Sequence, residues 1–140
     1  MRFWDSSALL PLFVRESDTR RLEDLIRTDD AVAVWMLTRL ELFSALARRG
    51  RQDAASAPRL LAARGEIIEA WPRWVEIAAI EPVRQHAERL VETHPLRAAD
   101  ALQVGAALVA ASGDPASLEF VTLDQRQAEA ASREGFRVLG

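Results

Sequence analysis

The chain has 140 residues, of which 49% are hydrophobic and 28% are charged, and its formal net charge is −3. These values predict a single globular domain over residues 1–140 and exclude a disordered chain. The sequence contains neither cysteine nor lysine, which excludes disulfides, thiolate metal sites, a P-loop and Schiff-base chemistry.

The hydrophobic segments are too short for a membrane span or a signal peptide. The longest of them, residues 98–111, contains Asp100 and Gln103. We therefore expect a cytoplasmic protein with no membrane partner. The negative net charge provides no global attraction for nucleic acid, so such binding would need local arginine clusters or metal ions held by acidic residues.

The predicted elements alternate between strands and helices along the chain. We expect a strand at 2–5, helices at 7–15 and 19–28, a buried strand at 31–35, and a helix at 38–49 that ends at Gly50. A helical region at 54–72 follows, then a strand at 75–80, helices at 82–92 and 96–111, a strand at 118–123, a helix at 125–134 and a strand at 136–139. This order predicts an α/β fold whose parallel sheet is covered on both faces, with sites at the carboxyl ends of its strands.

Four acidic residues stand out because they lie where an element begins, ends or turns inward. Asp5 ends the first predicted strand and Asp124 follows the fourth, while Glu41 and Asp100 lie on predicted helices. A carboxylate on an apolar element is costly to bury without compensation. One hard divalent cation with oxygen ligands would compensate several carboxylates together.

Each of these acids also has a purely structural explanation. Asp5 and Asp124 are good N-caps for the helices that follow them. Glu41 completes a capping box that begins at Thr38. Asp100 could pair with Arg97, but such a pair contributes only a few tenths of a kcal/mol and does not explain an acid inside the most apolar helix.

Together with the residues around them, the four acids resemble the motifs of the PIN-domain ribonucleases, and in particular of the VapC-type toxins of bacterial toxin–antitoxin pairs. The resemblance covers nearly the whole chain. Its segments are residues 3–10 around Asp5, residues 37–49 around Glu41, residues 94–103 around Asp100 and residues 120–127 around Asp124. The motif around Asp100 is the most specific of them.

The resemblance implies a three-layer α/β/α fold with a central, mostly parallel sheet. It also implies Mg²⁺ or Mn²⁺ as cofactor, RNA as substrate, a cognate antitoxin as partner, and a homodimer. By position, Asp5 and Asp100 match the family's principal metal ligands, and Glu41 and Asp124 match its remaining acids. Ser7 and Thr122 match hydroxyl positions that support these carboxylates.

The chemistry expected of this set is metal-assisted hydrolysis of RNA by an endoribonuclease toxin. The two histidines are scattered and favour no metal-free acid–base mechanism. Two other functions remain open, a catalytically silent module that binds RNA or a partner and a metal-dependent DNA nuclease. The arginines 48, 49 and 51 suit a solvated helix end through the helix dipole, or else contact RNA phosphates.

Overall fold

The fold is built on a five-stranded sheet in which every strand is parallel to its neighbours. In the computed structural model, which describes residues 1–140, the strands are β1 (Arg2–Trp4), β2 (Val32–Trp35), β3 (Val75–Ile77), β4 (Glu119–Val121) and β5 (Arg137–Leu139). Their order across the sheet is β3-β2-β1-β4-β5. The chain therefore builds outward from β1 in one direction and then returns to continue on the other side of β1, which creates a switch point between β1 and β4.

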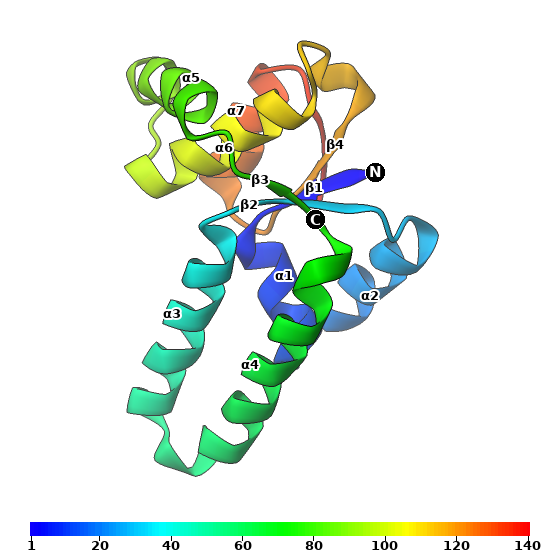
Figure 1. Ribbon diagram of the computed structural model, residues 1–140, viewed down its shortest axis with the longest axis vertical. Helices are drawn as coiled ribbons and strands as arrows, with labels where there is room; N and C mark the ends of the chain where they lie inside the picture. The colour runs from blue at the N-terminus through cyan, green and yellow to red at the C-terminus, as the bar shows by residue number, and fades with distance from the viewer.

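Seven α-helices cover the sheet in two layers (Figure 1). One layer consists of α1 (Ser6–Phe13), α2 (Thr19–Thr28), α3 (Thr38–Gln52) and α4 (Ala57–Ala70), with α3 and α4 projecting as a long hairpin. The other layer consists of α5 (Ile80–Thr93), α6 (Ala98–Ala110) and α7 (Gln125–Arg133). Short 3₁₀ turns lie at 54–56, 71–73 and 115–117. The predicted three-layer α/β/α fold is thus confirmed.

The two faces of the sheet are covered by separate hydrophobic cores. Phe3 of β1 packs with Phe120 of β4 and with residues of α5 and α6 on one face. Trp4, the next residue along β1, packs with residues of α1, α3 and α4 on the opposite face. Successive side chains of a strand point to opposite faces, so a strand that is buried on both faces is continuously apolar, as β2 is.

Two packing details distinguish the observed elements from the predicted ones. The strand expected at 75–80 is only Val75–Ile77, and it is largely exposed because it forms an edge of the sheet. The helix expected to end at Gly50 continues through that residue to Gln52, where Asp53 becomes the C-cap. A glycine thus favours a helix end without imposing one, and here its φ is not positive.

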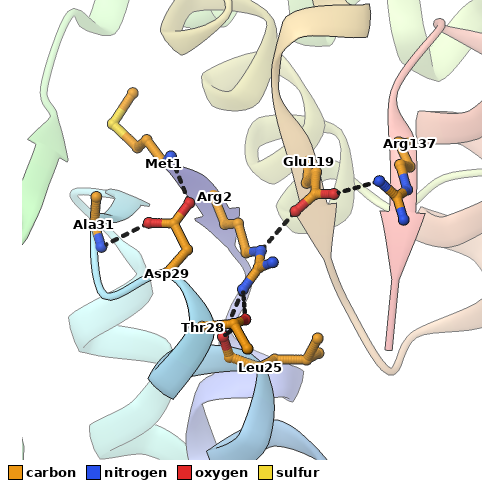
Figure 2. Close-up of polar contacts among 8 residues, drawn as sticks. All are labelled: Met1, Arg2, Leu25, Thr28, Asp29, Ala31, Glu119 and Arg137. Carbon is orange, nitrogen blue, oxygen red and sulfur yellow. Dashed lines mark hydrogen bonds and ion pairs between the residues drawn. The ribbon is translucent and has the colours of Figure 1, made fainter.

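The amino ends of the strands are joined by a polar cluster (Figure 2). Arg2 donates to Glu119 at 2.6 Å and to Thr28 of α2 at 2.8 Å, and Glu119 also pairs with Arg137 at 2.9 Å. These contacts tie β1, β4, β5 and α2 together at one end of the sheet. The opposite end, where the strands have their carboxyl termini, is left for the polar residues described below.

A second polar cluster fastens α5 to α7. Glu134 accepts two hydrogen bonds from Arg89, at 2.7 and 3.0 Å, and lies 2.8 Å from the ring of buried His94. The hydrogen bond from Arg89 is the main reason that the pKa of Glu134 falls to about 2. The position of His94 is thereby accounted for without catalysis. None of the helices is both long and apolar enough to cross a bilayer.

Candidate metal and nucleic-acid site

The candidate site lies at the switch point, at the carboxyl ends of β1 and β4. Asp5 follows β1 directly, and its backbone amide continues the sheet by donating to Val121 at 3.1 Å. Thr122 and Asp124 follow β4, which is hydrogen-bonded to β1. Adjacent parallel strands that turn into opposite helical layers leave a crevice between them, where ligands bind in folds of this type.

Asp5 is the most buried of the four acids, with an exposed fraction of 1%. It is also the N-cap of α1, because its Oδ2 accepts from the amide of Ser7 at 3.2 Å and its Oδ1 accepts from the Ser7 hydroxyl at 2.8 Å. Burial raises the pKa of Asp5 to about 6, although the hydrogen bonds of Ser7 and Thr122 act in the opposite direction. The capping role proposed from the sequence is therefore real, but it leaves a desolvated carboxylate at the site.

The hydroxyls of Ser7 and Thr122 connect the two strand ends. Ser7 Oγ accepts from the amide of Leu123 at 2.9 Å and lies 3.3 Å from the Thr122 hydroxyl. Thr122 Oγ1 in turn accepts from the amide of Asp124 at 3.0 Å. These side chains hold the loop after β4 against the start of α1, so the positions of Asp5 and Asp124 are linked.

Glu41 faces the site from α3 and does not form the capping box expected with Thr38. Helix α3 begins at Thr38, and the Glu41 carboxylate accepts from Ser6 Oγ at 2.8 Å and from Gln103 Nε2 at 3.0 Å. Desolvation is the main reason that the pKa of Glu41 is raised, and the charge of Asp100 raises it further. The box prediction was wrong because tertiary partners compete successfully for this side chain.

Asp100 is part of α6, but it lies in the first turn of the helix because α6 begins at Ala98. The sequence had suggested a position in the helix interior. Its Oδ2 accepts from the backbone amide of Arg97 at 3.3 Å, and the expected ion pair with the Arg97 guanidinium is absent. Its Oδ1 accepts from Gln127 Nε2 at 3.2 Å. An acid in the first turn is favoured by the helix dipole, which removes the objection that it interrupts the helix.

Asp124 is the N-cap of α7, as its sequence context predicted. Its Oδ1 accepts from the backbone amide of Gln127 at 2.9 Å. Gln127 therefore contacts two of the four acids, through its backbone to Asp124 and through its side chain to Asp100. The acids at the starts of α6 and α7 are held side by side by this single residue.

Two buried glutamines are the site residues that sequence reasoning missed. Gln103 is fully buried and donates to Thr38 at 2.9 Å as well as to Glu41, and Gln127 is only 4% exposed. The amide oxygen of each has no hydrogen-bond partner. For Gln103 the available signal was a glutamine in an otherwise apolar helix, because a buried amide requires a polar partner, whereas α7, which carries Gln127, is largely polar and gave no such signal.

Two open cavities border the carboxylates from different sides. The first, of about 690 Å³, is lined by residues of α1 and α3 that include Ser6, Ser7, Glu41, Arg48 and Arg49, and we call it the α1–α3 cavity. The second, of about 440 Å³, has no hydrophobic residue in its lining and is called here the α6–α7 cavity; its residues are Arg97, Asp100, Asp124, Gln125, Arg126 and Glu129.

The three arginines proposed for RNA do not share one environment. Arg48 is exposed and lines the α1–α3 cavity, and Arg49 lines the same cavity while pairing with Glu16. Arg51 is exposed but does not line either cavity. All three lie near the C-terminus of α3, where the helix dipole favours cations.

The chemistry of the acidic group suits a divalent cation. None of the four carboxylates pairs with an arginine or the amino terminus, although eleven such ion pairs occur elsewhere in the chain. Two of the four have a pKa raised by burial, so their negative charge is poorly compensated. All the available donors are oxygens, which Mg²⁺ and Mn²⁺ prefer. No three acidic or histidine side chains lie close enough together in the structure to hold one ion.

Comparison with known proteins shows the family of the chain. The PIN domain family matches residues 2–133. Ribonuclease VapC45 of Mycobacterium tuberculosis (strain CDC 1551 / Oshkosh) is 30% identical over 97% of this chain and 92% of its own length.

Two solved structures share the fold. FitAcB from Neisseria gonorrhoeae covers the whole chain and 97% of its own chain with a TM-score of 0.62 and 17% identity. A toxin–antitoxin complex from Klebsiella pneumoniae gives the same coverage with a TM-score of 0.61 and 15% identity.

A five-stranded parallel sheet between two helical layers defines the class of fold. With the family match over residues 2–133 and the similarity to a VapC ribonuclease, the chain belongs to the PIN-domain family, in its VapC group.

Proposed function

We propose that this chain is the toxin of a toxin–antitoxin pair and acts as a metal-dependent endoribonuclease. The observation that supports the proposal is that Asp5, Glu41, Asp100 and Asp124 lie around the switch point without any cationic partner, with Asp5 influenced by Glu41, Glu41 by Asp100, and Asp100 joined to Asp124 through Gln127. The similarity to a protein named as a VapC ribonuclease supports RNA as the substrate. The reaction is hydrolysis of a phosphodiester bond that leaves a 5′-phosphate and a 3′-hydroxyl.

In this proposal Asp5 and Asp100 hold Mg²⁺ or Mn²⁺, and Glu41 and Asp124 complete the ligand set or position water. A divalent ion at such a site supplies an activated water and offsets the charge that develops on the phosphoryl oxygens. With a pKa of about 6, Asp5 is largely ionised at neutral pH and available for a cation.

The residues around the acids orient them. Ser7 fixes the rotation of the Asp5 carboxylate, and Gln103 and Ser6 hold Glu41 between α6 and α1. Thr122 positions the backbone that carries Asp124. Arg48 lies in the same cavity as Glu41 and binds a phosphate of the RNA, while Arg49 contributes from its pair with Glu16. Arg51, one turn further along, adds to the local positive potential.

The partners in the proposal are RNA, a cognate antitoxin and a second copy of the chain. One solved neighbour is a toxin–antitoxin complex, which supports the antitoxin. If the antitoxin exists, a small protein encoded next to this chain should suppress its growth inhibition when the two are produced together. Sedimentation of the purified chain tests the homodimer.

Cleavage of labelled total RNA and of single-stranded DNA by the purified chain tests the activity. We expect discrete RNA cuts in Mg²⁺ or Mn²⁺ that vanish in EDTA and in a folded Asp100→Asn variant. Cleavage of DNA in preference to RNA would replace the proposal with a DNA nuclease. Binding of RNA without any cut, unchanged by Asp100→Asn, would replace it with a binding module.

A further inference from the structure

The α6–α7 cavity contains two arginines whose position has no structural explanation. Arg97 is the N-cap residue of α6, and Arg126 is the second residue of α7. Both side chains are exposed. A helix N-terminus carries the positive end of the helix dipole, so a cation placed there destabilises the folded chain. The helix dipole stabilises Arg48, Arg49 and Arg51 at a helix C-terminus, but it disfavours Arg97 and Arg126 at helix N-termini.

Neither arginine is compensated by an acid. Asp100, Asp124 and Glu129 line the same cavity, yet none of them forms an ion pair with Arg97 or Arg126. Asp100 instead accepts from the backbone amide of Arg97 and from Gln127, and Glu129 accepts from Gln125 at 3.3 Å. The guanidinium groups thus keep all of their side-chain donors free beside the proposed catalytic carboxylates.

The composition of the cavity indicates what it binds. No hydrophobic residue lines it, which disfavours a base-stacking pocket or a site for an apolar peptide. The two guanidinium groups keep their donors free for an anion of phosphate type, and they share the cavity with three carboxylates, two of which are the proposed metal ligands Asp100 and Asp124. The cavity shares Asp100 and Asp124 with the proposed metal site, so the phosphate that it binds lies beside the one that is cleaved.

We propose that Arg97 and Arg126 bind the RNA phosphate adjacent to the scissile one, so that the strand crosses the four carboxylates between the α6–α7 cavity and the α1–α3 cavity. This inference rests on the proposed ribonuclease function and names a second arginine cluster for the same substrate. The two residues are positioning residues, because they hold a phosphate that does not react. The unfavourable placement of the two cations at helix N-termini is offset when RNA binds, and such costs are common at functional sites.

The test compares an Arg97→Gln/Arg126→Gln double variant with Arg133→Gln. Arg133 lies in the last turn of the same helix as Arg126, is exposed, and pairs with no acid, so it controls for loss of positive charge. Removal of uniform binding raises KM and leaves kcat unchanged. We expect the double variant to raise KM at least about tenfold, as loss of hydrogen bonds between charged groups does, with kcat close to that of the parent.

RNA binding gives a readout independent of turnover. RNA binding is measured in an Asp5→Asn background that does not cleave. There the slope of the logarithm of the RNA association constant against the logarithm of the salt concentration should become less steep in the double glutamine variant, by about 0.7, for the loss of one phosphate contact on a single strand. An Arg97→Lys/Arg126→Lys variant should recover the slope, because it keeps the charge. The melting temperature of the glutamine variant should be unchanged or raised, since it relieves two cations at helix N-termini.

Neutral methylphosphonate linkages locate the contact once the cleavage site is mapped. At one linkage beside the cut, this substitution should raise KM for the parent but cause no further increase for the double variant. The inference is overturned if the effects add at every linkage, or if the double variant behaves like Arg133→Gln. It is also overturned if RNA binding is unchanged and only affinity for an antitoxin falls. Failure of the parent to cut RNA, in contrast, refutes the proposed function itself.

Discussion

Replacing Asp5 with asparagine should change how the stability of the chain depends on pH. Asp5 has a pKa of about 6 in the folded chain and 3.8 in the unfolded chain. Because the folded state binds the proton more tightly, the contribution is fully present below pH 3.8 and is lost as the pH rises through 6. The full difference corresponds to about 3 kcal/mol, and about 1.4 kcal/mol of it is lost between pH 5 and pH 8.

The asparagine variant cannot ionise, so it should lack this loss. Urea unfolding of both proteins in EDTA, at intervals from pH 5 to pH 8, measures the free energy of unfolding directly. The variant should gain about 1.4 kcal/mol relative to the parent across this range, whatever constant cost the amide adds. Gln125→Ala, which removes no titratable group from the α6–α7 cavity, should run parallel to the parent. Parallel curves for Asp5→Asn as well would refute the claim that Asp5 is a desolvated, uncompensated carboxylate.

Three further substitutions test the environment of Glu41 and the packing of the helices. Gln103→Leu keeps the volume of a buried side chain but removes the hydrogen-bond donor to Glu41. The Mg²⁺ concentration for half-maximal cleavage should therefore rise by about 10–100-fold. An unchanged concentration would show that Gln103 only fills space. Gly105→Ala should lower the free energy of unfolding by about 1–3 kcal/mol, because a Cβ there would lie 2.9 Å from the carbonyl oxygen of Val83. At Gly65 no atom lies within 4 Å of an added Cβ, so Gly65→Ala should stabilise the chain by about 0.5–1 kcal/mol in the same denaturant titration. Equal effects of the two alanine substitutions would contradict the packing of α5 on α6.

The architecture was predictable because its signals are local. The continuous apolar run of β2 and the alternation of strands with helices predicted a parallel sheet with helices on both faces, which the structure confirms. The capping roles of Asp5 and Asp124 were also readable, since a cap depends only on residues within one turn. The family match likewise agrees with the resemblance seen in the motifs.

The parts that sequence reasoning missed depend on tertiary contacts. Glu41 has a local capping partner available in the sequence, yet its carboxylate bonds to Ser6 and Gln103. No periodicity could show that Gln103 on α6 reaches Glu41 on α3, because the two residues lie 62 positions apart in the sequence. Arg97 and Arg126 are far apart in the sequence, and only the fold brings them into one cavity at the starts of α6 and α7.

In the proposed mechanism the four carboxylates together bind a divalent ion. Titration of the chain with Mn²⁺, followed by electron paramagnetic resonance, measures this binding without requiring a substrate. The parent should bind Mn²⁺, Asp5→Asn and Asp100→Asn should each abolish or greatly weaken binding, and Glu129→Gln should bind like the parent. Mn²⁺ binding that survives both aspartate substitutions, in proteins that remain folded, would contradict the account.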